Sequence, residues 1–328
     1  MHRFRGVRAG VGIVALLVAS ACTSGNPPST SPAATAQATS AATVAPPATA
    51  SPAATASPAT QASPAAPIPT DSVAEAFPRD KFSDPTTIDS KWLPLIPGTQ
   101  FVWDGKILVD DERLDHRVVS TVTDLIKVVD GVRTVVVLEQ DFTPTNVKAE
   151  AELSFYAQDD DGNVWLIGEY PEEYEDGKLA AAPAWMSGID GARAGLVVQA
   201  DPKLGEPSYS EGWAPSVGFA DRARVFETHS KTCVRVGCHD DVLVIDEFNP
   251  DEPDAHQFKY YAPGMGVVRV GWAGALEDTQ ETLELTRVAT LDPEAIAKVR
   301  ATALALEKSA YQVSPKMYGQ TEPAVQAP

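Results

Sequence analysis

Acidic residues and lysine are missing from the first part of this chain. No Asp or Glu occurs before Asp71, and residues 1–70 contain three Arg and no Lys. The remainder carries 23 of the 26 basic residues and all 45 acidic ones, which gives it a net charge of −22. A folded region so acidic has no electrostatic attraction for nucleic acid or for an anionic membrane surface. We therefore expect no nucleic-acid partner.

Recognisable catalytic motifs are missing as well. The chain has no G-x-S-x-G elbow, no H-E-x-x-H, no P-loop and no dinucleotide-binding glycine pattern. Four histidines follow residue 22, and two of them, His116 and His256, lie in polar stretches that favour the surface. We expect a non-enzymatic protein without cofactor or metal. A hydrolase whose His, Ser and Asp meet only in space is the weakest alternative.

No apolar run is long enough to span a bilayer, which takes roughly 20 residues. The first such run, Ala9–Val18, follows three arginines and precedes the small residues Ala19-Ser20-Ala21. This order is typical of a secretory signal peptide. The stretch Val18–Cys22 then resembles the lipobox of bacterial lipoproteins, in which the cysteine becomes the lipidated first residue of the mature protein.

The lipobox resemblance implies a location. Residues 1–21 would be a lipoprotein signal peptide, and Cys22 would hold the protein by its lipid on the extracytoplasmic side of a bacterial cell membrane. Two or more acyl chains suffice for stable attachment. Free secretion after cleavage at Ala19-x-Ala21 is the alternative, and the cysteine directly after that site favours lipidation.

Residues 22–70 are predicted to be the lipidated cysteine and a disordered tether. The stretch from Asn26 to Thr70 is almost entirely Ala, Pro, Ser and Thr, with a loose repeat of the Ser-Pro-Ala type. Such a sequence cannot bury enough apolar surface to offset its ordering entropy. As extended polyproline II it would reach about 140 Å. A plain spacer is the favoured interpretation, and an O-glycosylated stalk is the alternative.

The two cysteines beyond Cys22 form an even pair, and an exported protein favours a disulfide between Cys233 and Cys238. The pattern H-x3-C-x4-C-H, with His229 and His239, also offers zinc ligands, but its spacing matches no familiar structural site. We therefore predict a disulfide that clamps a hairpin tip, and no metal.

Two acidic stretches are predicted to be a turn and a loop, and not metal sites. Asp159-Asp160-Asp161-Gly162-Asn163 is predicted to be a hairpin turn, because Ala157 breaks the alternation that a calcium loop needs. The run from Glu169 to Asp176 is predicted to be a solvated loop.

Residues 71–312 are predicted to form a single domain that is mainly β. Short β-type runs alternate with Asp-Gly turns at Asp130-Gly131 and, less clearly, at Asp104-Gly105 and Asp176-Gly177. The alternation over Ala149–Phe155 predicts a half-buried strand. We expect an antiparallel meander that forms a curved sheet or an open half-barrel. Residues 189–218 are irregular and could cover one end of it.

One amphipathic helix is expected near the C-terminus. Asp292 is a suitable N-cap, Pro293 fits the first helical position, and an apolar stripe runs to about Ala310. Residues 313–328 are expected to be a disordered tail.

Three short motifs resemble those of an uncharacterised group of secreted, β-rich bacterial proteins. They are P-G-T-x-x-x-W at Pro97–Trp103, Y-A-Q-D…G-N-V-W between Tyr156 and Trp165, and K-Y-Y-A-P-G-x-G at Lys259–Gly266. The resemblance implies a fold and no activity, so the ligand-binding residues are left unassigned.

Strand aromatics such as Trp103 and Tyr261 could line an open half-barrel. The leading hypothesis is thus an envelope lipoprotein that binds a hydrophobic small molecule or lipid. A structural or interaction module that contacts an envelope protein or cell-wall polymer is the alternative. A dry apolar cavity of several hundred Å³ would favour the first.

Overall fold

The computed structural model describes residues 74–109 and 111–328. The predicted signal peptide, Cys22 and the predicted tether lie outside these residues. The described part belongs to one compact unit, which is mainly β, as the sequence predicts. Its elements are η1 (Arg79–Lys81), β1 (Thr99–Val109), β2 (Glu112–Val129), β3 (Val132–Phe142), β4 (Lys148–Gln158), β5 (Val164–Glu175), β6 (Lys178–Ala181), β7 (Trp185–Met186), β8 (Arg193–Val198), β9 (Tyr209–Ser210), β10 (Gly212–Trp213), β11 (Arg222–Val234), β12 (Gly237–Phe248), β13 (His256–Ala262), β14 (Gly266–Ala273), β15 (Thr282–Thr290), α1 (Pro293–Val313), α2 (Pro315–Tyr318) and β16 (Val325–Gln326).

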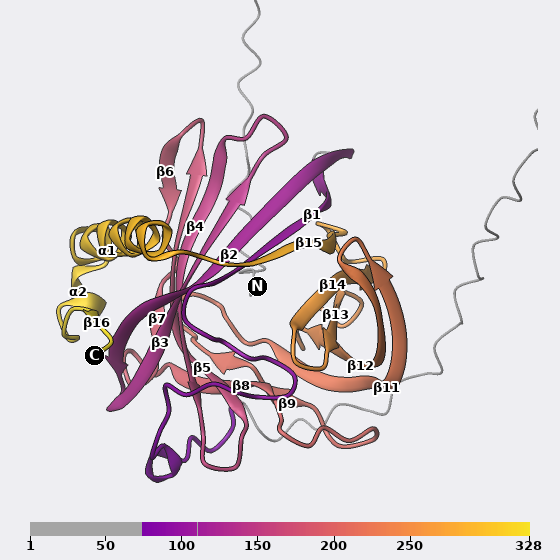
Figure 1. Ribbon diagram of the computed structural model, residues 1–328, viewed down its shortest axis with the longest axis horizontal. Helices are drawn as coiled ribbons and strands as arrows, with labels where there is room; N and C mark the ends of the chain where they lie inside the picture. The colour runs from indigo at the N-terminus through magenta and orange to yellow at the C-terminus, as the bar shows by residue number, and fades with distance from the viewer. Residues whose placement is uncertain (1–73, 110) are drawn as a thin grey trace, which may run out of the picture. The chain divides into compact units, whose positions relative to one another are not determined.

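The strands form one antiparallel sheet that curls on itself without closing into a barrel (Figure 1). Its order is β10-β8-β5-β4-β3-β2-β1-β15-β14-β13-β12-β11-β9. Sequential hairpins build most of it, and β15 returns to pair with β1. The two ends of this order belong to one short stretch, Tyr209–Trp213, which pairs with β11 through β9 and with β8 through β10. The irregular region 189–218 therefore brings the two ends of the sheet together.

The Asp-Gly turns are partly confirmed. Asp130-Gly131 joins β2 to β3 with positive φ at both residues, as a tight hairpin requires. Asp176-Gly177 likewise joins β5 to β6. The prediction for Asp104-Gly105 is wrong, because both residues lie inside β1. Gly105 is needed there for close approach: a Cβ on it would lie 1.7 Å from the carbonyl oxygen of Thr282.

The predicted helix forms as α1, and the side chain of Asp292 accepts a hydrogen bond from the backbone N–H of Ala295 at 2.8 Å. Figure 1 shows α1 packed on one face of the sheet, where it contacts β2 and β4. The expected disordered tail is instead ordered. Met317 and Tyr318 are buried under α1, and β16 pairs with β2. Burial of these two large side chains supplies the stabilisation that sequence periodicity does not reveal.

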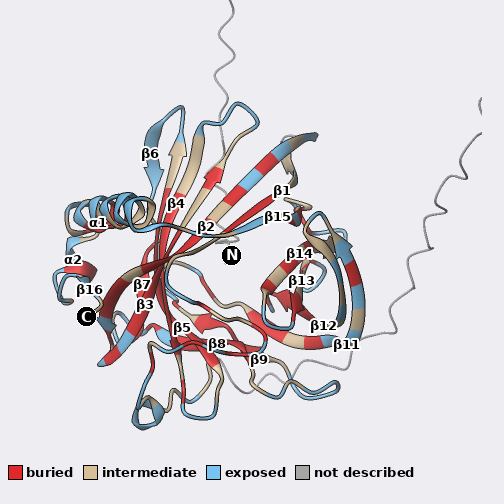
Figure 2. Ribbon diagram, in the orientation of Figure 1, coloured by how far each residue is buried: buried red, intermediate tan, exposed pale blue. Residues whose placement is uncertain are grey.

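The sheet is buried on both faces over much of its length (Figure 2). Residues 151–157 of β4 are all buried, so the expectation of a half-buried strand is wrong. Leu153 and Phe155 face α1. Glu152 and Ser154 point to the other, concave face, where the curled sheet encloses them. The polar side chains that alternate along β4 therefore face the enclosed, concave side of the sheet instead of solvent.

The acidic run that starts at Glu169 is also different from its prediction. Most of it continues β5 instead of forming a solvated loop, and Glu169 and Glu172 are buried. Glu172 accepts hydrogen bonds from the hydroxyls of Tyr170 and Tyr174. The tyrosines interleaved in the run are thus its hydrogen-bond donors.

Among the helices within residues 74–328, none has both the length and the apolar character needed to cross a bilayer.

Candidate functional site

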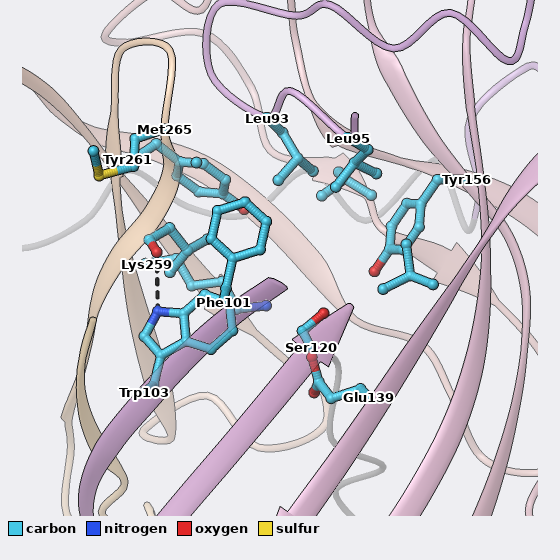
Figure 3. A pocket seen from close by; sticks show the side chains of 14 residues that line it. Leu93, Leu95, Phe101, Trp103, Ser120, Glu139, Tyr156, Lys259, Tyr261 and Met265 are labelled. Atoms are coloured by element: carbon cyan, nitrogen blue, oxygen red, sulfur yellow. Dashed lines mark hydrogen bonds between the residues drawn. The ribbon is translucent and has the colours of Figure 1, made fainter. Parts of the chain in front are cut away.

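The concave face of the sheet contains a pocket with a volume of about 60 Å³ (Figure 3). Its wall is more apolar than polar. Residues from β1, β2, β3 and β4 line it on one side and residues from β13 and β14 on the other. The lining residues are Leu93, Leu95, Phe101, Trp103, Ser120, Val137, Glu139, Tyr156, Val197, Lys259, Tyr261, Met265, Gly266 and Val267.

The three motifs that carry the family resemblance meet at this pocket. The first contributes Trp103, the second Tyr156, and the third Lys259 and Tyr261. Trp103 also ties the first motif to the residue that directly follows the third, because its indole N–H donates a hydrogen bond to the carbonyl oxygen of Val267 at 3.0 Å (Figure 3). Segments more than 150 residues apart in the chain are therefore brought to one place.

The mouth of the pocket is apolar. Leu93 and Leu95 come from the loop before β1, which two backbone hydrogen bonds fix: Leu95 N–H to Ile88 O at 3.0 Å, and Gly264 N–H to Lys91 O at 2.7 Å. Met265 in the β13–β14 turn completes this rim and is half-buried. In Figure 3 the two leucines lie opposite Met265.

The floor carries fixed polar groups. Ser120 and Glu139 are direct cross-strand partners on β2 and β3, and Figure 3 shows them beside each other with Tyr156 nearby. Burial, followed by the carboxylates of Glu169 and Glu152, raises the pKa of Tyr156 well above its usual range. Burial also raises the pKa of Glu139. The floor thus holds a protonated phenol, a hydroxyl and a carboxyl group that resists ionisation.

Lys259 is the buried ammonium of this interior. It is 1% exposed, and its Nζ lies 2.5 Å from Oε2 of Glu247. Burial lowers the pKa of Lys259, but the carboxylates of Glu247 and Glu211 outweigh that effect, so the pKa is raised overall. Burial and Glu247 in turn raise the pKa of Glu211 well above its usual range. Glu211 lies at the point where the two ends of the sheet meet.

This pocket is not the dry cavity of several hundred Å³ that would accommodate a whole apolar ligand. Its volume is well below the roughly 300 Å³ at which small-molecule sites begin, and Lys259 and Glu139 line it. The interior is small, and polar side chains such as Glu139 of β3, Tyr156 of β4 and Lys259 of β13 face it among the apolar ones. Trp103 and Tyr261 do line it, as expected of strand aromatics.

The predicted disulfide is present. Cys233 and Cys238 are opposite residues of β11 and β12, and their sulfurs are bonded at 2.04 Å. With both thiols in the disulfide, zinc has no thiolate ligand here. His229 instead bonds to Asp241 through Nδ1. Within the described residues no cluster of three or more His, Cys, Asp or Glu has a geometry suited to a metal ion.

Two histidines are not at the surface as predicted. His116 is 7% exposed, and its Nε2 lies 2.9 Å from Oε1 of Glu281. His256 is partly buried and bonds to Asp246 through Nδ1 at 2.8 Å. Each ring therefore has a carboxylate beside it, from Glu281 for His116 and from the neighbouring strand β12 for His256. The hydrogen bond that the His256 ring donates to the carboxylate of Asp246 raises the pKa of His256 and outweighs burial, which lowers it.

The Asp159–Asn163 turn forms as predicted. The carboxylate of Asp159 accepts hydrogen bonds from the backbone N–H groups of Asp161 and Asn163 and from the indole of Trp165. The carboxylate of Asp159 is therefore used for hydrogen bonds within its own hairpin.

Comparison with known proteins gives little. No protein-family model and no curated protein matches the chain. Two solved structures match with 99% of their own length and 61% of this chain. One is a protein of Bacteroides fragilis assigned as exported and as having a YmcC-like fold, with 14% identity and a TM-score of 0.37. The other is assigned as a lipoprotein of Parabacteroides distasonis, with 11% identity and a TM-score of 0.33. At these values the likeness carries no functional argument.

Proposed function

We propose that this protein is a non-enzymatic, lipid-anchored binding protein of the bacterial cell envelope. The observation that carries the proposal is the convergence of three distant motifs on one interior pocket with an apolar rim and a polar floor. An apolar wall with a few convergent polar groups whose pKa values are perturbed is typical of binding sites, although this pocket is smaller than most of them.

The anchor belongs to this proposal through Cys22. The lipobox-like stretch Val18–Cys22 supports attachment by an N-terminal lipid, and the acidity of the folded region argues against contact with an anionic bilayer surface. Replacing Cys22 by Ala should release the protein from membranes. If the Cys22→Ala protein still leaves the membrane fraction only when detergent is added, attachment through Cys22 would be contradicted.

The pocket selects its ligand by size and by polarity. About 60 Å³ holds only the end of a molecule, so the rest of the ligand must lie against the rim of Leu93, Leu95 and Met265. The charge of Lys259 is already balanced by Glu247, and an anion entering this interior would lose its hydration without a free cation to replace it. The proposed ligand is therefore a small hydrophobic molecule or lipid with an uncharged hydrogen-bonding end group.

The test uses the full chain and the dye Nile red, with n-octanol and octanoate as competitors. Octanol should displace the dye at lower concentration than octanoate, because only the alcohol enters without burying a charge. Native mass spectrometry of protein purified from its own host should also reveal a bound small molecule. Equal competition by the two compounds would contradict the proposed polarity.

Met265→Trp provides the specific variant, since the larger side chain would obstruct the rim. Leu204→Trp is the matched control, because Leu204 is exposed on a loop outside the pocket. Met265→Trp should lose dye binding and Leu204→Trp should retain it. Retention by both variants would exclude this pocket as the site.

A hydrolase receives less support. His116 is buried beside Glu281 and borders a second, polar groove. The described lining of that groove contains no serine or cysteine to act as a nucleophile. Binding therefore remains the proposed function.

A further inference from the structure

A polar groove of about 350 Å³ lies between the β1–β2 hairpin, the β3–β4 turn and the disulfide-closed tip of β11–β12. It shares no lining residue with the interior pocket. Its lining residues are Asp104, Gly105, Asp115, His116, Arg117, Phe142, Thr143, Pro144, Asn146 and Arg235.

Two ion pairs at hydrogen-bond distance hold charged side chains at this groove, and Arg235 lies outside both. Nε of Arg117 donates to Oδ1 of Asp104 at 2.6 Å, and Nζ of Lys106 donates to Oδ1 of Asp115 at 2.6 Å. Arg235 is exposed, and its side chain forms no hydrogen bond and no close ion pair with any residue that the structure describes. Its charge still acts on the groove, because burial raises the pKa of Asp104 but Arg235, together with Arg117, lowers it overall. A planar guanidinium whose N–H groups are free matches a carboxylate through two parallel hydrogen bonds.

The position of Arg235 is fixed by covalent and hydrogen bonds. It lies within the short loop that the Cys233–Cys238 disulfide closes. The carbonyl oxygen of Cys233 accepts a hydrogen bond from Nη2 of Arg269 at 2.8 Å, which ties the hairpin tip to β14. Such pre-organisation lowers the entropy lost on binding.

The remaining lining suits a molecule rich in hydroxyl groups. The side-chain amide of Asn146 has no hydrogen-bond partner among the described residues, and Asp115 has a second carboxylate oxygen. Phe142 is half-buried and offers an apolar surface. The volume lies near the lower end of the range for small-molecule sites, about 300–1,000 Å³. Asp104 and Asp115 would repel a doubly charged phosphate ester more strongly than a singly charged carboxylate.

We propose that this groove binds a saccharide unit that carries one carboxylate. Arg235 pairs with the carboxylate, Asn146 and Asp115 bond to hydroxyl groups, and Phe142 contacts the sugar ring. The site is separate from the interior pocket and takes a ligand of opposite polarity.

Calorimetric titration of the full chain tests this proposal with glucuronate, glucose and inorganic phosphate. Glucuronate should bind at millimolar concentration, with glucose and phosphate about tenfold weaker or more, as expected for one charge-assisted pair. Arg235→Gln should weaken glucuronate binding about tenfold. Arg133→Gln, at an exposed arginine outside the groove, should not change it.

The disulfide gives an independent readout. The Cys233→Ser/Cys238→Ser double variant should weaken glucuronate binding while octanol still displaces Nile red from the interior pocket. N-acetylmuramic acid, whose carboxylate is on a lactyl ether, distinguishes a cell-wall source from a uronic acid.

Three outcomes would overturn the proposal: no binding of either acidic sugar, equal binding of glucose and glucuronate, or an unchanged affinity in Arg235→Gln. None of these outcomes affects the Nile red experiment, so the two proposals fail separately.

Discussion

The sheet buries a lysine on each of its faces, and the two have opposite electrostatic settings. Under α1, Nζ of Lys127 lies 2.8 Å from Oε1 of Glu307 and 2.7 Å from the carbonyl oxygen of Glu322, with two tyrosine rings nearby. Burial dominates and lowers the pKa of Lys127. On the concave face the carboxylates around Lys259 raise its pKa instead. Under α1, Lys127 has a single carboxylate partner, Glu307, so burial decides the direction in which its pKa moves. On the concave face the carboxylates outnumber the lysine, so they outweigh burial and raise its pKa.

The largest expected effect is that of Lys259→Met. This change leaves Glu247 and Glu211 without their cation, and breaking a buried ion pair costs roughly 3–5 kcal/mol. The loss of stability should be greater at pH 8 than at pH 5, because Glu211, whose pKa is raised well above its usual range, escapes the penalty by taking up a proton. Urea unfolding at both pH values measures it, and an equal loss at both would contradict the carboxylate-rich interior.

Lys127→Met should cost less, about 2 kcal/mol, the value of hydrogen bonds to a charged group. Glu307 keeps the backbone N–H of Ala324 as a donor. Adding Glu307→Leu should restore most of the loss, because a buried pair can be replaced by apolar side chains with little cost. Urea unfolding of the single and double variants tests this, and no recovery in the double variant would refute it.

Glu169→Gln should stabilise the protein at pH 6 by about 2 kcal/mol, and more at higher pH. Burial raises the pKa of Glu169 to about 8. A carboxyl group with a raised folded-state pKa makes stability fall as the pH rises from about 4.5, its unfolded value, towards 8. Glutamine keeps an acceptor for the indole N–H of Trp185, which lies 2.9 Å from Glu169. The variant and the parent should be equally stable at pH 4.5, which unfolding across this range checks.

The smallest effect is expected at the surface of α1. Nζ of Lys298 lies 2.7 Å from Oε1 of Glu294, one turn away on the exposed side of the helix. Lys298→Ala should cost at most about 0.5 kcal/mol, and less at high salt. Thermal unfolding at two salt concentrations measures it. A loss as large as that of Lys127→Met would erase the distinction between buried and exposed pairs.

Local sequence signals predicted the local structure well. The turn at Asp130-Gly131, the N-cap at Asp292 and the cysteine pair each depend on neighbours in the chain. Alternation in β4 correctly separated Leu153 from Glu152. It could not show that the second face is also enclosed, because enclosure depends on how far the whole sheet curls.

The pocket was harder to find for the same reason. Its polar groups, Ser120, Glu139 and Lys259, are ordinary strand residues in sequence, and the Lys259–Glu247 pair joins different strands. The available signal is the set of three motifs, whose resemblance implies a fold and no site. The place where the motifs meet could not be predicted without the strand order, in which β15 returns to pair with β1.

The outer edge of β11 has a consequence for how copies of the chain meet. Only Arg222 and Ala223 of this strand pair with β9, and its register against β12 shifts at three places between Val225 and Thr232. Exposed charges at Glu227 and Lys231 lie in the same stretch. Bulges and charges make an unpaired edge a poor template for another strand. The sheet can therefore remain open while resisting the edge-to-edge association that leads to aggregation.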